Sequence, residues 1–162
     1  QSENLISKIP GAVLNKFNVS LLTRRLSMAT DWVLSNPHTE KLQLSYFASS
    51  TGGAAALMAA CRYNIVSIVI RSGRTDLVEN QFLEQMVLPC LFVVGSGEKS
   101  VVKISKDTMK KMRNSKEKRL SIIEGASHLF EEEGTMHDVA EIATQWITRH
   151  FTLRINTNSI DK

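Results

Sequence analysis

The chain has 162 residues, 43% of them hydrophobic, which suits one globular domain with a single core and is too short for two ordinary domains. Its 20 Lys and Arg are interleaved with 16 Asp and Glu, and no segment has the roughly 18 uninterrupted apolar residues that a membrane span needs. These features argue against a membrane protein and, because no base-stacking aromatic residues accompany the basic ones, against nucleic-acid binding.

The first part of the chain is expected to be an arm followed by a helix. Residues 1–18 contain the turn signal Pro10-Gly11 and no sustained periodicity, so they are interpreted as an N-terminal arm or linker. Between Val19 and Ser35 apolar residues recur every three to four positions, which predicts an amphipathic helix that Asn36-Pro37 ends. The apolar residues of this helix are Leu21, Leu22, Leu26, Met28, Ala29, Trp32 and Val33.

The rest of the chain alternates predicted strands and helices. Strands are expected at residues 42–47, 65–70, 90–94 and 119–123, and helices at 51–62, 78–86, 104–113 and 135–151. The strands at 65–70 and 90–94 are almost wholly apolar, which is typical of strands covered on both faces. The pattern predicts an α/β domain at residues 19–152, with a mostly parallel sheet and helices on both faces, followed by a polar C-terminal tail at 153–162.

A short turn joins the first predicted strand to the next helix, and Ser50 is at its apex. Such a turn strains its central residue and needs small residues two positions before and after, as Ala48 and Gly52 are. It would present the Ser50 hydroxyl at a helix N-terminus, with the Thr51 amide as an oxyanion donor. The alternative is that the small residues only let the helix approach the sheet and that Ser50 caps the helix.

A serine nucleophile needs a base and an acid. His128 lies in the loop directly after the last predicted strand, and Glu98 lies in a Gly-rich loop after the third. Glu98 would accept the second imidazole N–H and stabilise the cation formed when His128 takes the serine proton. Taken singly, each is better explained as a solvated or structural loop residue. Their order favours a site, because α/β sheets place active sites at the carboxyl ends of successive strands.

These loops and their flanks resemble the dienelactone hydrolase-like branch of the α/β-hydrolases. The similar segments are residues 46–57, 71–77, 94–98 and 125–132, within a resemblance that runs from about 17 to 151. The resemblance implies a serine esterase-type hydrolase of a small ester or lactone, without cofactor, with Ser50 as nucleophile, His128 as base and Glu98 as acid. Two positions depart from the family pattern: Ala48 stands for the usual Gly, and Glu98 stands where Asp is typical.

A larger departure concerns the N-terminal part. Members of the family have further strands and a second oxyanion amide there, whereas only residues 1–18 precede the first shared helix. We therefore expect a truncated α/β-hydrolase fold of about four strands, whose strand at Leu42 to Phe47 is an open edge for a second copy or a companion chain. A truncated, non-catalytic domain that associates through this edge is the alternative function. A polyanion-binding module on the basic stretch from Lys103 to Arg119 is a third and weaker one.

Other residues have weaker signals. Arg71 and Arg74 are candidates for binding a substrate carboxylate, although a surface pair with nearby acids explains them more simply. No His or Cys pair has metal-ligand spacing, so neither a metal nor another cofactor is expected. Cys61 and Cys90 lie in apolar surroundings and are interpreted as buried thiols. Because the N-terminus also lacks a signal-peptide pattern, a cytoplasmic protein is expected.

Overall fold

The structure, a computed structural model, describes residues 18–160, and of residues 155–160 the helical backbone alone. The arm expected at residues 1–18 thus lies almost wholly outside the described residues. The strands are β1 (Leu44–Ser49), β2 (Ile65–Arg71), β3 (Cys90–Gly95) and β4 (Lys118–Ile123). The helices are α3 (Val19–Ser35), α4 (Thr51–Ala60), the 3-10 helix η1 (Thr75–Leu77), α5 (Asn80–Gln85), α6 (Lys99–Lys111) and α7 (Thr135–Ile160).

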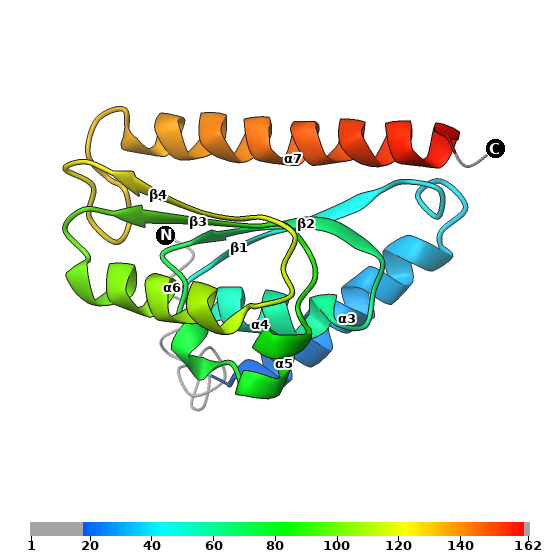
Figure 1. Ribbon diagram of the computed structural model, residues 1–162, viewed down its shortest axis with the longest axis horizontal. Helices are drawn as coiled ribbons and strands as arrows, with labels where there is room; N and C mark the ends of the chain where they lie inside the picture. The colour runs from blue at the N-terminus through cyan, green and yellow to red at the C-terminus, as the bar shows by residue number, and fades with distance from the viewer. Residues whose placement is uncertain (1–17, 161–162) are drawn as a thin grey trace, which may run out of the picture.

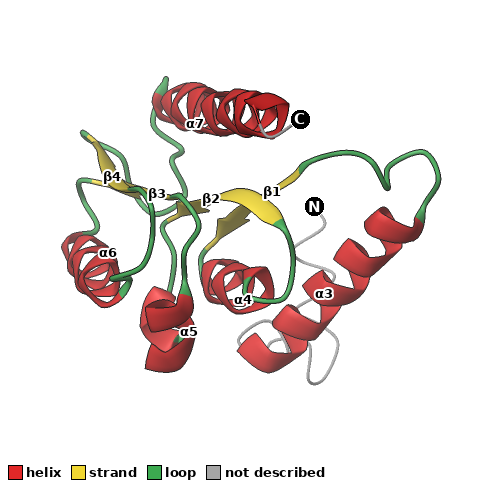
Figure 2. Cartoon of the chain, turned by 45° about the vertical axis from the view of Figure 1, so that its right-hand side comes forward, coloured by secondary structure: helices red, strands yellow, loops and turns green. Residues whose placement is uncertain are grey.

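The four strands form one parallel sheet in the order β1-β2-β3-β4 (Figure 1). Helices cover both of its faces: α7 lies alone on one, and α3, α4, α5 and α6 lie on the other (Figures 1 and 2). Alternate strand residues serve the two layers, so Ile70 joins the core on the α4 side and Val69 joins Trp146 of α7. The predicted α/β class is confirmed, and all four strands end at the same edge of the sheet.

Two element boundaries differ from the prediction by five residues or more, and the others by no more than two. Helix α6 begins at Lys99, five residues before its predicted start, because its first turn places two valines side by side and not at the three-to-four spacing used to locate the helix. Helix α7 runs to Ile160, so residues 153–160, assigned to the tail, are helical. No Gly or Pro follows Gly134 in the sequence, and a polar composition alone does not end a helix.

Helix α3 packs small polar side chains on the core, beside two partly buried apolar ones. Its buried residues are Thr23, Ser27 and Thr30, and the Thr30 hydroxyl lies 2.8 Å from that of Tyr46. In contrast, Met28 and Trp32, expected among the packing residues, are 63% and 64% exposed. The sequence pattern thus located the helix but misplaced part of its packing face. Small buried side chains suit a close approach to α4, which is rich in alanine.

Strand β1 lies at the edge of the sheet. Within the described residues it pairs with β2 only, so its other edge is open there, and its Phe47 side chain is half-exposed.

Between residues 18 and 160 no helix has both the length and the apolar character that crossing a bilayer requires. Both cysteines are free thiols: Cys90 is buried as expected, whereas Cys61, just past the end of α4, is exposed. The expectation that Cys61 is buried is therefore wrong.

Candidate active site

Ser50 occupies the strained turn between β1 and α4. Its backbone angles are φ 51° and ψ −129°, in a region that residues with a side chain rarely adopt. Three backbone hydrogen bonds fix this geometry: Ser50 N–H donates to the Arg71 carbonyl at 3.1 Å, and the amides of Gly53 and Arg74 each donate to the Ser50 carbonyl at 3.0 Å. The Ser50 side chain makes no capping hydrogen bond. The predicted strain is confirmed, and the interpretation of Ser50 as a capping residue is wrong.

The close approach at this turn involves Gly53 and not Gly52. A Cβ added at Gly52 would meet no heavy atom within 4 Å, whereas one at Gly53 would lie 2.8 Å from Ile70 Cγ2. Gly53 therefore lets α4 rest on β2. Among the described residues, the Thr51 N–H donates to no backbone carbonyl outside the helices and strands. As the first amide of α4 it also has no partner within the helix, so it is available to a ligand.

Glu98 and His128 are in contact. His128 Nδ1 lies 2.5 Å from Glu98 Oε1, and the Glu98 side chain is 9% exposed while that of His128 is 47% exposed. Glu98 precedes the first residue of α6, yet its side chain makes no capping bond. Its carboxylate turns instead toward the histidine loop. The structure thus brings together two of the three predicted catalytic residues.

The second oxygen of Glu98 accepts a hydrogen bond from Ser72, a residue that the sequence interpretation did not single out. Ser72 follows β2, is almost completely buried, and has a positive φ of 44°. The segment 71–77 resembles the corresponding segment of the family, but nothing in the sequence pairs position 72 with position 98. Ser72 therefore supplies the contact that fixes the longer Glu side chain.

Hydrogen bonds from backbone amides hold the histidine loop against the acid loop. The Gly97 amide donates to the Ala126 carbonyl at 3.2 Å, and the Gly125 amide donates to Ser96 Oγ at 2.9 Å. A Cβ added at Gly95 would lie 2.2 Å from the Ala126 oxygen, so this close approach requires a glycine at the end of β3. The position of His128 is thus set by the loop after the neighbouring strand.

Ser50 follows β1 and His128 lies in the loop after β4, the two outer strands of the sheet. Among the described residues, their side chains form no hydrogen bond with each other. The histidine loop nevertheless reaches back across β3. Its Phe130 ring lies 5.5 Å from the Arg71 guanidinium carbon at the end of β2. Arg71 is in register with Ser49, and its carbonyl accepts from Ser50 N–H. The loop therefore extends to the strand next to the Ser50 turn.

The two candidate arginines differ. Arg74 forms a two-point ion pair with Asp76, with both N···O distances 2.8 Å, and this hydrogen bonding raises the pKa of Arg74 and lowers that of Asp76. Arg71 contacts the Met136 sulfur at 3.6 Å, and its buried Nε has no hydrogen-bond partner among the described residues. The simpler interpretation, a surface pair with a nearby acid, thus describes Arg74 and not Arg71.

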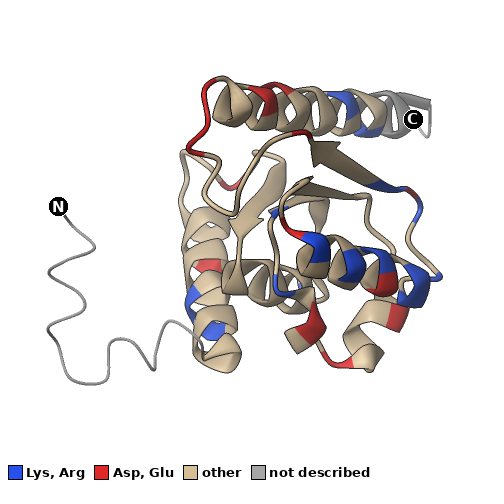
Figure 3. Cartoon of the chain, turned by 90° about the vertical axis from the view of Figure 1, so that its left-hand side faces the viewer, with Lys and Arg blue, Asp and Glu red and all other residues tan. Residues whose placement is uncertain are grey.

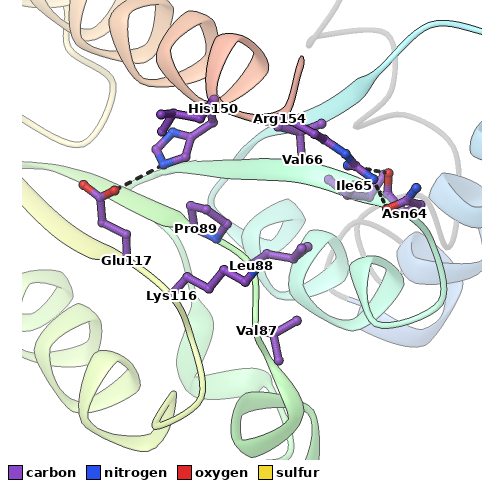
Figure 4. A pocket seen from close by; sticks show the side chains of 11 residues that line it. Asn64, Ile65, Val66, Val87, Leu88, Pro89, Lys116, Glu117, His150 and Arg154 are labelled. Atoms are coloured by element: carbon purple, nitrogen blue, oxygen red, sulfur yellow. Dashed lines mark hydrogen bonds and ion pairs between the residues drawn. The ribbon is translucent and has the colours of Figure 1, made fainter. Parts of the chain in front are cut away.

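A separate cavity of about 500 Å³ lies at the opposite end of the strands (Figure 4). In it, the buried His150 points to Glu117, with 3.3 Å between Nε2 and Oε2, and Arg149 also pairs with Glu117. Its lining residues are Asn64, Ile65, Val66, Val87, Leu88, Pro89, Lys116, Glu117, His150, Leu153 and Arg154. Because Ser50, Glu98 and His128 are not among them, this cavity is not the pocket of the candidate active site.

The basic stretch lies in α6, the turn after it and the start of β4 (Figure 3). Lys103 and Lys110 both pair with Asp107, at 3.1 and 3.3 Å, so part of this charge is neutralised locally. Among residues 18–160 no group of three or more His, Cys, Asp or Glu side chains is arranged to hold a metal ion.

Comparison with known proteins finds relatives of two kinds. No protein-family model matches the chain. In two strains of Mycobacterium tuberculosis, a protein provisionally named a phosphoribosyl transferase is 37% identical over 138 residues, which are 84% of this chain and 30% of that protein. A dienelactone hydrolase from Anabaena variabilis is similar in structure, with a TM-score of 0.77 and 41% identity. That match covers 82% of this chain and 61% of the Anabaena chain.

Two more distant structures share the fold. Est1E from Butyrivibrio proteoclasticus has a TM-score of 0.69 at 13% identity, over 83% of this chain and 71% of its own. A lipase-esterase related protein from Clostridium acetobutylicum has a TM-score of 0.56 at 14% identity, and the match covers 79% of this chain and 75% of the Clostridium chain. The chain thus spans less than two thirds of the Anabaena hydrolase and less than one third of the mycobacterial relative.

Proposed function

We propose that the chain, which is related to the dienelactone hydrolase-like α/β-hydrolases, is a serine hydrolase of small esters or lactones. Ser50 is the proposed nucleophile, His128 the base and Glu98 the acid. The observation that carries the proposal is the 2.5 Å contact between Glu98 and His128, at the edge of the sheet where the strained Ser50 turn also lies. A buried carboxylate bound to a half-exposed imidazole is what a general base requires.

In the proposed reaction, the hydrogen bond to Glu98 keeps a proton on His128 Nδ1 and leaves Nε2 free to act as the base. As Ser50 Oγ attacks the carbonyl carbon, its proton passes to Nε2, and the Thr51 amide donates to the developing oxyanion. Collapse of this intermediate breaks the ester C–O bond, and the leaving oxygen takes the proton from Nε2. A water molecule, deprotonated by His128, then attacks the acyl-enzyme. The bond between the acyl carbon and Ser50 Oγ breaks, Oγ takes the proton back from Nε2, and the carboxylic acid is released.

The rate of turnover depends on a second oxyanion donor. Thr51 supplies one amide, and loss of one donor typically lowers the rate by about 10² to 10³-fold. We propose that the second donor comes from polypeptide outside the described residues, in this chain, a companion chain or a second copy. The match to 61% of the Anabaena hydrolase supports this, because that enzyme contains further chain.

Arg71 is the proposed contact for an anionic substrate. Its partly buried guanidinium lies at the end of β2 beside the histidine loop and has no acidic partner among the described residues. Arg74 is a weaker candidate, because it is already bound to Asp76. The expected result for Arg71→Met is a higher KM for a lactone that carries a carboxylate and an unchanged KM for its neutral methyl ester. Equal KM changes for both would refute the contact.

Hydrolysis of p-nitrophenyl acetate tests the proposed function. We expect a burst of p-nitrophenol equivalent to the enzyme, because acylation of Ser50 precedes slower deacylation. Ser50→Ala should abolish the burst, and His128→Ala and Glu98→Gln should slow it. His137→Ala is the control, since His137 lies in α7 and not in the histidine loop. A burst of the same size in Ser50→Ala would rule out Ser50 as the nucleophile.

A second candidate function is association, in which the domain is not catalytic. It is favoured by the open edge of β1 and by the exposed Met28 and Trp32 on α3, the helix beside that edge (Figure 2). We propose that a second copy or a companion chain adds to β1 and covers these side chains. Molar mass in solution tests this: a complex should form, and Trp32→Lys should weaken it without lowering the stability of the monomer. A monomer that binds no companion chain would contradict it.

Two further points concern the relatives and the compartment. We propose no phosphoribosyl transfer for this chain, because the match covers 30% of the mycobacterial protein and its name applies to the whole. A cytoplasmic location is proposed on the basis of the free thiols Cys61 and Cys90, since unpaired cysteines are usual in reducing compartments.

A further inference from the structure

We propose that Ser72 is a positioning residue that orients Glu98 toward His128; the inference rests on the proposed function, because it concerns the same site. Ser72 follows the last residue of β2, and the residue is 1% exposed. Its hydroxyl donates to Glu98 Oε2, while Glu98 Oε1 lies 2.5 Å from His128 Nδ1. One oxygen of the Glu98 carboxylate thus contacts Ser72, and the other contacts the proposed base, His128.

Glu98 needs such an anchor because of its length and its place. A Glu side chain has one more rotatable bond than Asp, so more rotamers must be excluded to hold its carboxylate in one orientation. The carboxylate is nearly buried, and it does not cap α6, the helix that begins after it. A buried oxygen without a donor is costly, so the hydroxyl of Ser72 both satisfies Oε2 and fixes the direction of Oε1.

The backbone of Ser72 indicates that the hydroxyl is there for this contact. Its φ of 44° lies in the left-handed region that favours glycine, and its amide is held by the Val93 carbonyl at 2.8 Å. A glycine would adopt this conformation with less strain. The serine is therefore disfavoured locally, and the compensating interaction of its side chain is the hydrogen bond to Glu98.

The test exploits this conflict between backbone and side chain. Ser72→Gly removes the hydroxyl and relieves the strain, so the cost of the unsatisfied Glu98 oxygen is partly offset. We expect a denaturation midpoint close to that of the unsubstituted protein, together with a roughly tenfold slower reaction of Ser50 with a fluorophosphonate. In ester hydrolysis kcat should fall and KM should stay the same. Ser72→Ala keeps the strain and should match the slower labelling with lower stability. Unchanged labelling in both variants would overturn the inference.

Two further measurements separate positioning from other roles. In a Glu98→Ala background, Ser72→Gly should cause no additional loss of labelling, and an additional loss would show that Ser72 acts by another route. The downfield NMR signal of the His128 Nδ1 proton, assigned by its loss in Glu98→Ala, should weaken in Ser72→Gly. This signal does not depend on turnover. If Ser50 fails to react in the unsubstituted protein, the proposed function fails, while an unchanged signal in Ser72→Gly would refute the positioning role.

Discussion

Replacing Gly95 by alanine should disable the site through the histidine loop. The added Cβ would lie 2.2 Å from the Ala126 oxygen, 2.7 Å from its carbonyl carbon and 2.9 Å from the Ser127 oxygen, all of them backbone atoms. Reaching an ordinary contact of 3.4 Å requires the loop to retreat by about 1 Å. Ala126 is two residues from His128, so the 2.5 Å contact with Glu98 should lengthen.

The expected magnitude follows from this displacement. A misplacement of about 1 Å in a catalytic group can cost about 10²-fold in rate, and overpacking a tight contact typically costs about 1–3 kcal/mol of unfolding free energy. The assay is the rate of fluorophosphonate reaction at Ser50, measured together with urea denaturation. Labelling at the original rate in a folded Gly95→Ala variant would refute the conclusion that the loops after β3 and β4 position His128.

Three other predictions concern stability and reactivity. Gly52→Ala should raise the free energy of unfolding by about 0.5–1 kcal/mol, because the added Cβ meets no other atom and alanine favours a helix. Gly53→Ala should lower the free energy of unfolding, because its Cβ would lie too close to Ile70. Urea denaturation of the two variants measures both changes. Burial raises the pKa of both thiols, most for Cys90, so a thiol-specific disulfide reagent should modify Cys61 in the folded protein and Cys90 only after denaturation. The hydrogen bond from the Ser127 amide lowers the pKa of Glu132 below its ordinary 4.5; its stabilisation is therefore present above pH 4.5 and is lost as pH falls through the lower folded value, and Glu132→Gln should reduce this acid dependence in denaturation experiments.

The sequence was sufficient to locate the elements and the two ends of the acid–base contact. Periodicity gave α3 its observed limits, and apolar runs placed β2 and β3 within one residue. The small residues around Ser50 predicted its strained backbone. His128 and Glu98 could be paired because parallel strands end at one edge of the sheet, so order along the chain translates into proximity.

Contacts that depend on the third dimension could not be predicted from the sequence. The bond between Ser72 and Glu98 joins positions 26 residues apart and requires a backbone conformation that serine rarely adopts. Periodicity shows that α3 has an apolar side but not that smaller residues such as Thr30 face the core. Similarly, the sequence shows two adjacent glycines at positions 52 and 53. Only the packing of α4 on β2 shows that position 53 is the one that has no room for a side chain.

The most direct test of the proposed site is covalent labelling of the serine. The unsubstituted protein is treated with a fluorophosphonate, and the adduct is located by peptide mass spectrometry. We expect one adduct, on Ser50, which forms much more slowly in His128→Ala and at an unchanged rate in His137→Ala. An adduct on another residue, or labelling of Ser50 that does not depend on His128, would contradict it.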